Sequence, residues 1–226
     1  MVFWREITID NLHYLEAVFP LYDLVFPPEV REPHFVFLSA IKKKECFFHY
    51  LVGVESDEIV SFATAHYLAD VNTGFIVYIA TNPSFRKKGI GTETLINIEK
   101  ILKVESINAG HHDLRAIVVE TEKLELAQNE TQKEECLKRN LFFTKNKYSF
   151  YQAISYVQPP LHNEESPISL NLFIKSAQEG IPKEEVCNII SSIYLHKYHN
   201  INGIDMKTLI NCFNMMNIQV GKETGG

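Results

Sequence analysis

The chain has 226 residues, of which 46% are hydrophobic and 22% are charged, and its formal net charge at pH 7 is −6. This apolar content excludes a chain that is disordered throughout, and the acidic balance argues against a protein that binds nucleic acid through a general basic surface. No apolar run reaches the roughly 20 residues that a membrane-spanning helix needs, so no membrane partner is expected.

The cysteines and the N-terminal residues indicate a compartment. The first six residues show no basic segment followed by an apolar one, so no secretory signal is expected. The four cysteines are far apart and form no CxxC pair: Cys46, Cys136, Cys187 and Cys212. Free thiols in a reducing compartment fit this spacing better than a disulfide framework or a zinc site. The sequence therefore predicts a cytoplasmic protein without a metal site.

The first third of the chain alternates between strand and helix patterns. Residues 3–7 predict a short strand, and Asp10 is a candidate N-cap for the helix that follows. A second helix is predicted over residues 32–44. The β-rich runs at 47–54 and 59–67 are separated by a short polar stretch, which predicts an antiparallel hairpin.

The middle of the chain predicts a parallel crossover. An almost continuous apolar run at 75–80 is typical of a strand buried on both faces. A helix from about Thr92 to Val104 follows, and 114–121 predicts another buried strand. This order implies a right-handed parallel crossover inside an otherwise antiparallel sheet.

The last third adds further elements. A helix is predicted at 130–140, strands within 142–154, one more strand at 170–174, and helices at 183–198 and 205–216. The two last helices show no carboxylate or histidine cluster at ligand spacing, so residues 176–226 are expected to form a helical extension that adds no catalytic group. Their apolar faces would pack on the main domain, residues 1–175, or on a partner chain, which allows a homodimer.

The segment that joins the first buried strand to its helix has the features of an anion site. Arg86, Gly89 and Gly91 are spaced R-x-x-G-x-G. Glycine lets the backbone approach a ligand closely, and the N–H groups of a first helical turn have no intrahelical partners. The helix dipole, together with Arg86, Lys87 and Lys88, favours negative charge, so a pyrophosphate fits. The spacing is neither a Walker A motif nor G-x-G-x-x-G, which ranks nucleotide hydrolysis and NAD binding lower.

This strand, turn and helix resemble the signature [RQ]-x-x-G-x-[GA] of the GCN5-related N-acetyltransferase (GNAT) family, over roughly residues 2–155. The resemblance implies an α/β (α+β) GNAT fold, with a mixed, mostly antiparallel sheet, a splayed parallel strand pair and flanking helices, and it implies acetyl-CoA as co-substrate. The pantetheine arm would hydrogen-bond the main chain of Tyr78, Ile79 and Ala80. The pyrophosphate would lie on the N–H groups of Lys87, Lys88, Gly89, Ile90, Gly91 and Thr92.

The resemblance also suggests a catalytic base. Glu120 ends the next strand, as an acidic residue often does in this family. In a cleft, desolvation would raise its pKa towards that of a useful base, and a solvent-exposed strand end is the alternative. Leu137 replaces the tyrosine that protonates the leaving thiolate in many relatives, and Leu141 replaces a glycine. Water, Tyr148 or Tyr151 would then donate that proton.

The predicted function is direct transfer of an acetyl group from acetyl-CoA to a primary amine of a small molecule or peptide. The missing tyrosine and glycine leave a second interpretation open, a catalytically idle acyl-CoA-binding or regulatory module. His66 is the next candidate base after Glu120. Glu29 and Glu32 either contact a cationic acceptor or begin a helix, where acids are favoured. The acidic chain mildly favours a polyamine, an aminoglycoside or a lysine side chain as acceptor.

Overall fold

The computed structural model describes residues 1–43, 47–162, 166–178 and 180–219. The chain forms two compact units, one from residues 1–119 with 175–177 and the other from 120–174 with the residues after 177. Strand β5 (Ala116–Glu122) begins in the first unit and ends in the second. The domain boundary suggested near residue 175 stays a prediction.

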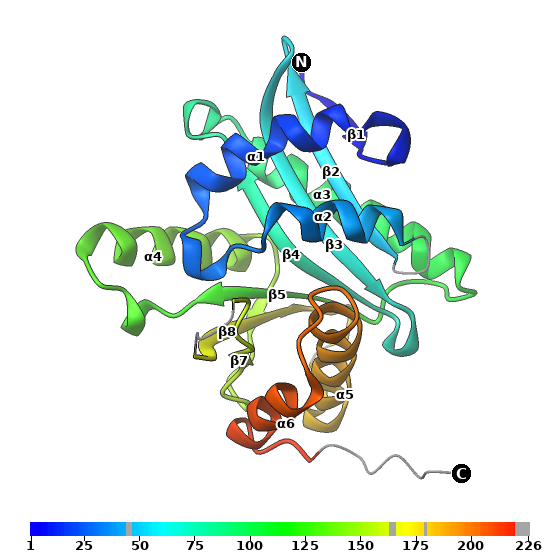
Figure 1. Ribbon diagram of the computed structural model, residues 1–226, viewed down its shortest axis with the longest axis vertical. Coiled ribbons are helices and arrows are strands. Elements are labelled where there is room, and N and C mark those ends of the chain that lie inside the picture. Colours follow the sequence, from blue (N-terminus) through cyan, green and yellow to red (C-terminus); the bar gives the residue numbers. More distant parts are fainter. Residues whose placement is uncertain (44–46, 163–165, 179, 220–226) are drawn as a thin grey trace. The chain divides into compact units, whose positions relative to one another are not determined.

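The first unit is a sheet with helices on both faces (Figure 1). Its elements are β1 (Phe3–Glu6), α1 (His13–Val25), α2 (His34–Lys42), β2 (Phe48–Glu55), β3 (Glu58–Leu68), β4 (Thr73–Thr81), α3 (Ile90–Asn108) and the start of β5. Strands β1 to β4 pair antiparallel in sequence order, and β4 pairs with β5 in parallel. Helices α1 and α2 cross one face of the long strands, and α3 covers the other. The predicted parallel crossover is confirmed.

Short-range signals explain where these elements begin. Thr8, and not Asp10, caps the 3-10 turn that precedes α1. Ser56 and Asp57 both have positive φ, 50° and 64°, as expected for the two-residue turns that match the twist of a hairpin. The helix predicted from Glu32 begins two residues later, because a residue before proline disfavours the helical conformation and Pro33 is the N-cap. Lys44, its predicted end, lies outside the described residues.

A cluster of aromatic side chains fills the space between α1, α2 and the sheet. Tyr22 is fully buried, and its ring centroid lies 4.9 Å from that of Phe37 and 5.0 Å from that of Tyr78. The N–H of Glu32 donates to the Tyr22 hydroxyl at 2.6 Å, and the Tyr78 hydroxyl donates to the Val30 carbonyl at 2.8 Å. Buried tyrosine hydroxyls need such partners, so these bonds fix the segment before α2 on β4.

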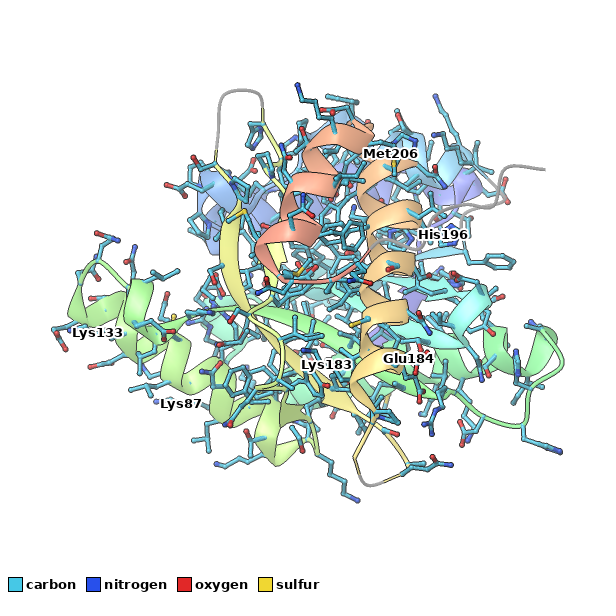
Figure 2. The ribbon with its side chains drawn as sticks, turned by 90° about the horizontal axis from the view of Figure 1, so that it is seen from below. Lys87, Lys133, Lys183, Glu184, His196 and Met206 are labelled. Carbon is cyan, nitrogen blue, oxygen red and sulfur yellow. The ribbon has the colours of Figure 1, made fainter. Side chains whose placement is uncertain are left out.

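The described part of the second unit consists of strands and helices. Its elements are the end of β5, α4 (Glu130–Lys145), β6 (Ser149–Phe150), β7 (Val157–Gln158), β8 (Ile168–Lys175), α5 (Lys183–Ile193), a π-helical stretch called here the π segment (Tyr194–His199), and α6 (Met206–Met215). Strands β6 and β7 each pair antiparallel with β8. Helix α5 runs into the π segment as one helix, past His196, and α6 starts at Met206 beside it (Figure 2).

The structure moves the boundary between α4 and the strands that follow, and β7 lies beyond the predicted range 142–154. The strands predicted from residue 142 begin only at Ser149, because α4 continues to Lys145. Cys136 and Phe143 are the buried residues of α4, seven positions apart, which is two helical turns. The apolar run at 141–143 therefore continues a helical pattern.

Two further predictions concern the whole chain. Of the helices in the described part of the chain, none has the length and apolar character needed to cross a membrane. The cysteines at positions 136, 187 and 212 are free thiols. Cys46 lies outside the described residues.

Gly74 of β4 provides a test of the packing between β4 and α3. A Cβ atom there would come within 2.6 Å of Cδ1 of Leu102, which is fully buried. We expect Gly74→Val to lower the free energy of unfolding by roughly 1–3 kcal/mol, because overpacking displaces side chains and backbone. Equilibrium urea unfolding measures the change. Leu102→Ala should cost less in the Gly74→Val background than in the wild type, and equal costs would show that this contact does not limit position 74.

Candidate functional site

The main chain after β4 forms a glycine-containing turn. Asn82 caps a short 3-10 turn through its side chain, which accepts a hydrogen bond from the Ser84 N–H at 3.0 Å. Lys87 and Gly89 then adopt left-handed conformations, with φ of 66° and 82°, and α3 begins at Ile90. A positive φ is uncommon for residues with a side chain and easy for glycine. The R-x-x-G-x-G spacing therefore reflects a backbone requirement at the start of α3.

The N-terminus of α3 is open to a ligand. Gly89 is its N-cap, and no side chain in the described part of the chain caps it. A Cβ atom on Gly89 would meet no protein atom within 4 Å. Arg86, Lys87 and Lys88 are exposed beside it, and a helix of this length presents about half a positive charge at its N-terminus. These features suit an anion that carries phosphate groups.

Two buried hydroxyl groups connect this turn to the end of β4. The Thr94 hydroxyl lies 2.7 Å from both the Ile90 carbonyl oxygen and the hydroxyl oxygen of Ser61, and it has one proton to donate to one of them. The Ser61 hydroxyl in turn contacts the Ala80 carbonyl. The first turn of α3 and the main chain at Ala80 are therefore held together by hydrogen bonds. Neither residue is predicted from the sequence, because a single serine and a single threonine in apolar segments form no motif.

The residues predicted to hold the pantetheine arm lie in the second half of β4. Tyr78, Ile79 and Ala80 pair antiparallel with residues 62–64 of β3. The parallel register between β4 and β5 is described as far as Ile76. The three residues therefore follow the end of that register on the strand that leads into the turn.

The second unit contains a carboxylate held by three polar side chains. Glu120 accepts hydrogen bonds from the hydroxyl of Tyr198 at 2.8 and 2.9 Å, from Nε2 of Gln158 at 3.1 Å, and from the hydroxyl of Tyr156. The two tyrosines and Gln158 are buried, whereas Glu120 keeps partial exposure. Lys197, which is fully buried, places a cation close enough to favour the ionised carboxylate.

These surroundings shift the pKa of Glu120. Burial raises the pKa to about 7, although the hydrogen bonds from Tyr156, Tyr198 and Gln158 and the charge of Lys197 act in the opposite direction. Burial, assisted by the charge of Glu120, raises the pKa of both tyrosines well above its ordinary value. The hydroxyls therefore stay protonated as donors while the carboxylate changes charge near neutral pH. Such a pKa suits a general base.

Other candidates from the sequence are placed differently. His66 is buried, with its ring centroid 4.0 Å from that of Phe48. Glu32 is also buried, and Glu29 is exposed. Within the described ranges, no group of three or more His, Cys, Asp or Glu side chains is arranged to hold a metal ion.

The tyrosines that contact Glu120 are Tyr156 and Tyr198, whereas Tyr148 and Tyr151 stay the predicted proton donors to the thiolate. Leu137 and Leu141 lie on the exposed side of α4, with 54% and 53% exposure, and Tyr148 is buried. Tyr156 and Tyr198, which contact Glu120, are 36 and 78 positions away from it in the chain. No spacing pattern links residues so far apart, so the sequence analysis could not find them.

A model of the acetyltransferase (GNAT) family matches residues 15–118. A protein from Bacteroides thetaiotaomicron described as a GNAT-family acetyltransferase has a TM-score of 0.66 at 20% identity, covering 90% of this chain and 99% of its own. An aminoglycoside 6'-N-acetyltransferase complexed with coenzyme A has a TM-score of 0.54 at 18% identity, covering 80% and 99%. The PaiA N-acetyltransferase of Thermoplasma acidophilum, also with coenzyme A, has a TM-score of 0.50 at 15% identity, covering 78% and 99%. No curated protein matches the sequence. The family resemblance and the GNAT fold are confirmed.

The raised pKa of Glu120 links stability to pH. The folded chain holds this proton up to about pH 7, whereas the unfolded chain releases it near the ordinary value of 4.5. Between these values the folded state binds more protons, so the contribution of Glu120 to the free energy of unfolding falls as pH rises, by roughly 3 kcal/mol over the window. Glu120→Gln cannot titrate. Its free energy of unfolding relative to the wild type should therefore increase between pH 5 and pH 8.

Urea unfolding at the two pH values measures this change, and Glu125→Gln is the control. Glu125 is exposed in the 3-10 turn that follows β5, so its substitution should give the same difference from the wild type at both pH values. A difference between Glu120→Gln and the wild type that does not vary with pH would contradict the raised pKa.

Proposed function

Because the chain has the fold and the family match of the GNAT acetyltransferases, we propose that it is an N-acetyltransferase that moves an acetyl group from acetyl-CoA to a primary amine. The observation that carries the proposal is the uncapped N-terminus of α3, with Gly89 at positive φ beside three exposed cations. Two solved structures with this fold are coenzyme A complexes. The free thiols of the described residues fit a cytoplasmic location.

The proposed contacts of acetyl-CoA follow the chain. The pyrophosphate would accept hydrogen bonds from the N–H groups of residues 87–92, with Arg86 as the nearest predicted side-chain contact. The pantetheine arm would lie along the main chain of residues 78–80. The hydroxyl pair Ser61 and Thr94 would keep these two parts of the binding surface in a fixed relation.

Glu120 is the proposed base. An alkylamine with a pKa of about 10.4 is protonated at neutral pH and must lose a proton before it can attack. With a pKa of about 7, Glu120 accepts that proton, and the amine nitrogen then attacks the thioester carbon. A main-chain N–H of β4 would stabilise the oxyanion. The C–S bond breaks to release a thiolate, and the nitrogen passes its second proton to that thiolate or to water, which gives the amide. A thiol of pKa about 8.5 leaves without obligatory help from a tyrosine at position 137.

An idle acyl-CoA-binding module is the second candidate, favoured by Leu137 and Leu141 on the exposed side of α4. Release of free thiol from acetyl-CoA separates the two. The acceptor panel contains spermidine, kanamycin and a lysine-containing peptide, because the acidic chain favours cationic amines. Amine-dependent thiol release supports the enzyme, whereas binding of acetyl-CoA without thiol release on a wide amine panel supports the idle module.

Gly89 allows a matched test of the coenzyme A site. We expect Gly89→Val to weaken the binding of coenzyme A by about 10- to 100-fold, the loss of one or two hydrogen bonds to a charged group. Gly110 is the control, because it also has a positive φ, 91°, and open space around its Cβ position. It follows the C-terminal end of α3, away from the proposed site. Both variants carry similar backbone strain, of about 1–2 kcal/mol. Isothermal titration should show weaker binding only for Gly89→Val, and equal losses in both variants would contradict the assignment.

Glu120→Gln tests the base. We expect kcat/KM to fall by about 10²–10⁴, the usual effect of losing a general base, while the affinity for coenzyme A is unchanged. Thiol release with the best amine of the panel measures the rate. Glu125→Gln should behave as the wild type. Wild-type turnover of Glu120→Gln across pH 6 to 9 would remove Glu120 from the mechanism.

A further inference from the structure

We propose that the π segment acts on Glu120, because it supplies Tyr198 and Lys197 as positioning residues for this carboxylate. The inference rests on the proposed function for the role of Glu120 as the base. It changes the role of the C-terminal residues, which the sequence indicated only as an extension without a catalytic group. The relevant contacts all lie within the second unit.

The hydrogen bonds give Tyr198 a defined direction. An ionised carboxylate only accepts hydrogen bonds, so the amide atom of Gln158 that faces Glu120 is the NH₂ group. The same NH₂ group lies 3.2 Å from the Tyr198 hydroxyl oxygen and donates to it. The single proton of the Tyr198 hydroxyl therefore points to Glu120, where it is shared between the two carboxylate oxygens at 2.9 and 2.8 Å. Tyr198 thus fixes the carboxylate and stabilises its ionised form.

Lys197 acts on the same carboxylate through its charge. Its side chain is fully buried, and its charge lowers the pKa of Glu120. In the described part of the chain, the charged and titratable groups that shift the pKa of Glu120 are Tyr156, from the segment before β7, and Lys197 and Tyr198, from the π segment. Lys197 is the cation among them. The charge of Glu120 in turn contributes to the raised pKa of Tyr194.

The backbone of the π segment fits a functional role. The N–H of Asn200 donates to the Leu195 carbonyl at 3.0 Å, and the N–H of Asn202 donates to the Lys197 carbonyl at 3.1 Å. Five-residue spacing of this kind is rare, and π-helical turns are frequent at functional sites. Buried ionic groups are also costly to retain for stability alone. Lys197 and Tyr198 would have a functional role beside Glu120, because both favour the ionised form of a carboxylate that must act as a base near neutral pH.

These contacts affect the proton that Glu120 takes from the amine. Glu120 takes it from the attacking amine and becomes a neutral carboxylic acid, while Tyr198 keeps its own proton throughout. Without the hydroxyl of Tyr198 or the charge of Lys197, the carboxylate would bind its proton more tightly and would be occupied at neutral pH. Together with Tyr156 and Gln158, the π segment would therefore lower the pH above which the enzyme is active.

Infrared difference spectroscopy on the full chain tests this without an acceptor. The carboxylic acid band that is present in the wild type and absent in Glu120→Gln belongs to Glu120, and its loss with rising pH gives the pKa. We expect the wild-type midpoint near 7. The midpoint should move up by about one to two pH units in Tyr198→Phe, it should move up by less in Lys197→Met, and it should stay near the wild-type value in Lys197→Arg.

Tyr194→Phe is the matched control. Tyr194 is in the same segment, is buried, and donates its hydroxyl proton to the Val157 carbonyl, so the variant loses a buried hydrogen bond that does not reach Glu120. Its midpoint should stay at the wild-type value. Unmoved midpoints in both Lys197→Met and Tyr198→Phe would overturn the proposal, and Lys197→Met decides alone if Tyr198→Phe does not fold. Thiol release by Glu120→Gln at the wild-type rate would instead refute Glu120 as the base. The contacts of Tyr198 and Lys197 with Glu120 would then have no role in catalysis.

Discussion

Two parallel strands that are neighbours in a sheet need a long crossover connection, and in this chain the crossover between β4 and β5 is α3. The chain leaves β4 at Thr81 and reaches the helix that packs on the sheet through a 3-10 turn and the glycine-containing turn. The N-terminus of α3, where a helix has N–H groups without intrahelical partners and the positive end of its dipole, therefore follows these turns. Gly89 at positive φ and the Ser61–Thr94 hydroxyl pair make this turn compatible with the packing of the strand.

The same crossover determines the position of Glu120, because β5 is the strand that follows α3. The described parallel register ends with Val119 on β5, and Glu120 is the next residue of the chain. Within β5, the chain thus passes from four buried residues, Ala116 to Val119, to Glu120, whose side chain contacts Tyr156, Gln158 and Tyr198. Burial and hydrogen bonding act on Glu120 in opposite directions, and burial has the larger effect on its pKa.

The fold around the turn could be predicted from the sequence, because its features depend on residues that are close together in the chain. The buried strands, the long helix between them and the R-x-x-G-x-G turn follow from periodicity and from the backbone freedom of glycine. The partners of Glu120 were not readable, since Tyr198 reaches it across 78 positions. The π segment also escaped, because the apolar spacing of residues 183–198 fits an ordinary helix, and the change to five-residue spacing is set by tertiary contacts.

The central claim is that coenzyme A binds to main-chain N–H groups at the start of α3. Hydrogen exchange of the full chain with and without coenzyme A measures these groups directly, because an amide that donates to a bound phosphate exchanges more slowly. The account predicts slower exchange at residues 87–92 when coenzyme A is present, with residues near the C-terminal end of α3, such as Ala109 and Gly110, unchanged. Saturated binding of coenzyme A with no change of exchange at residues 87–92 would contradict it.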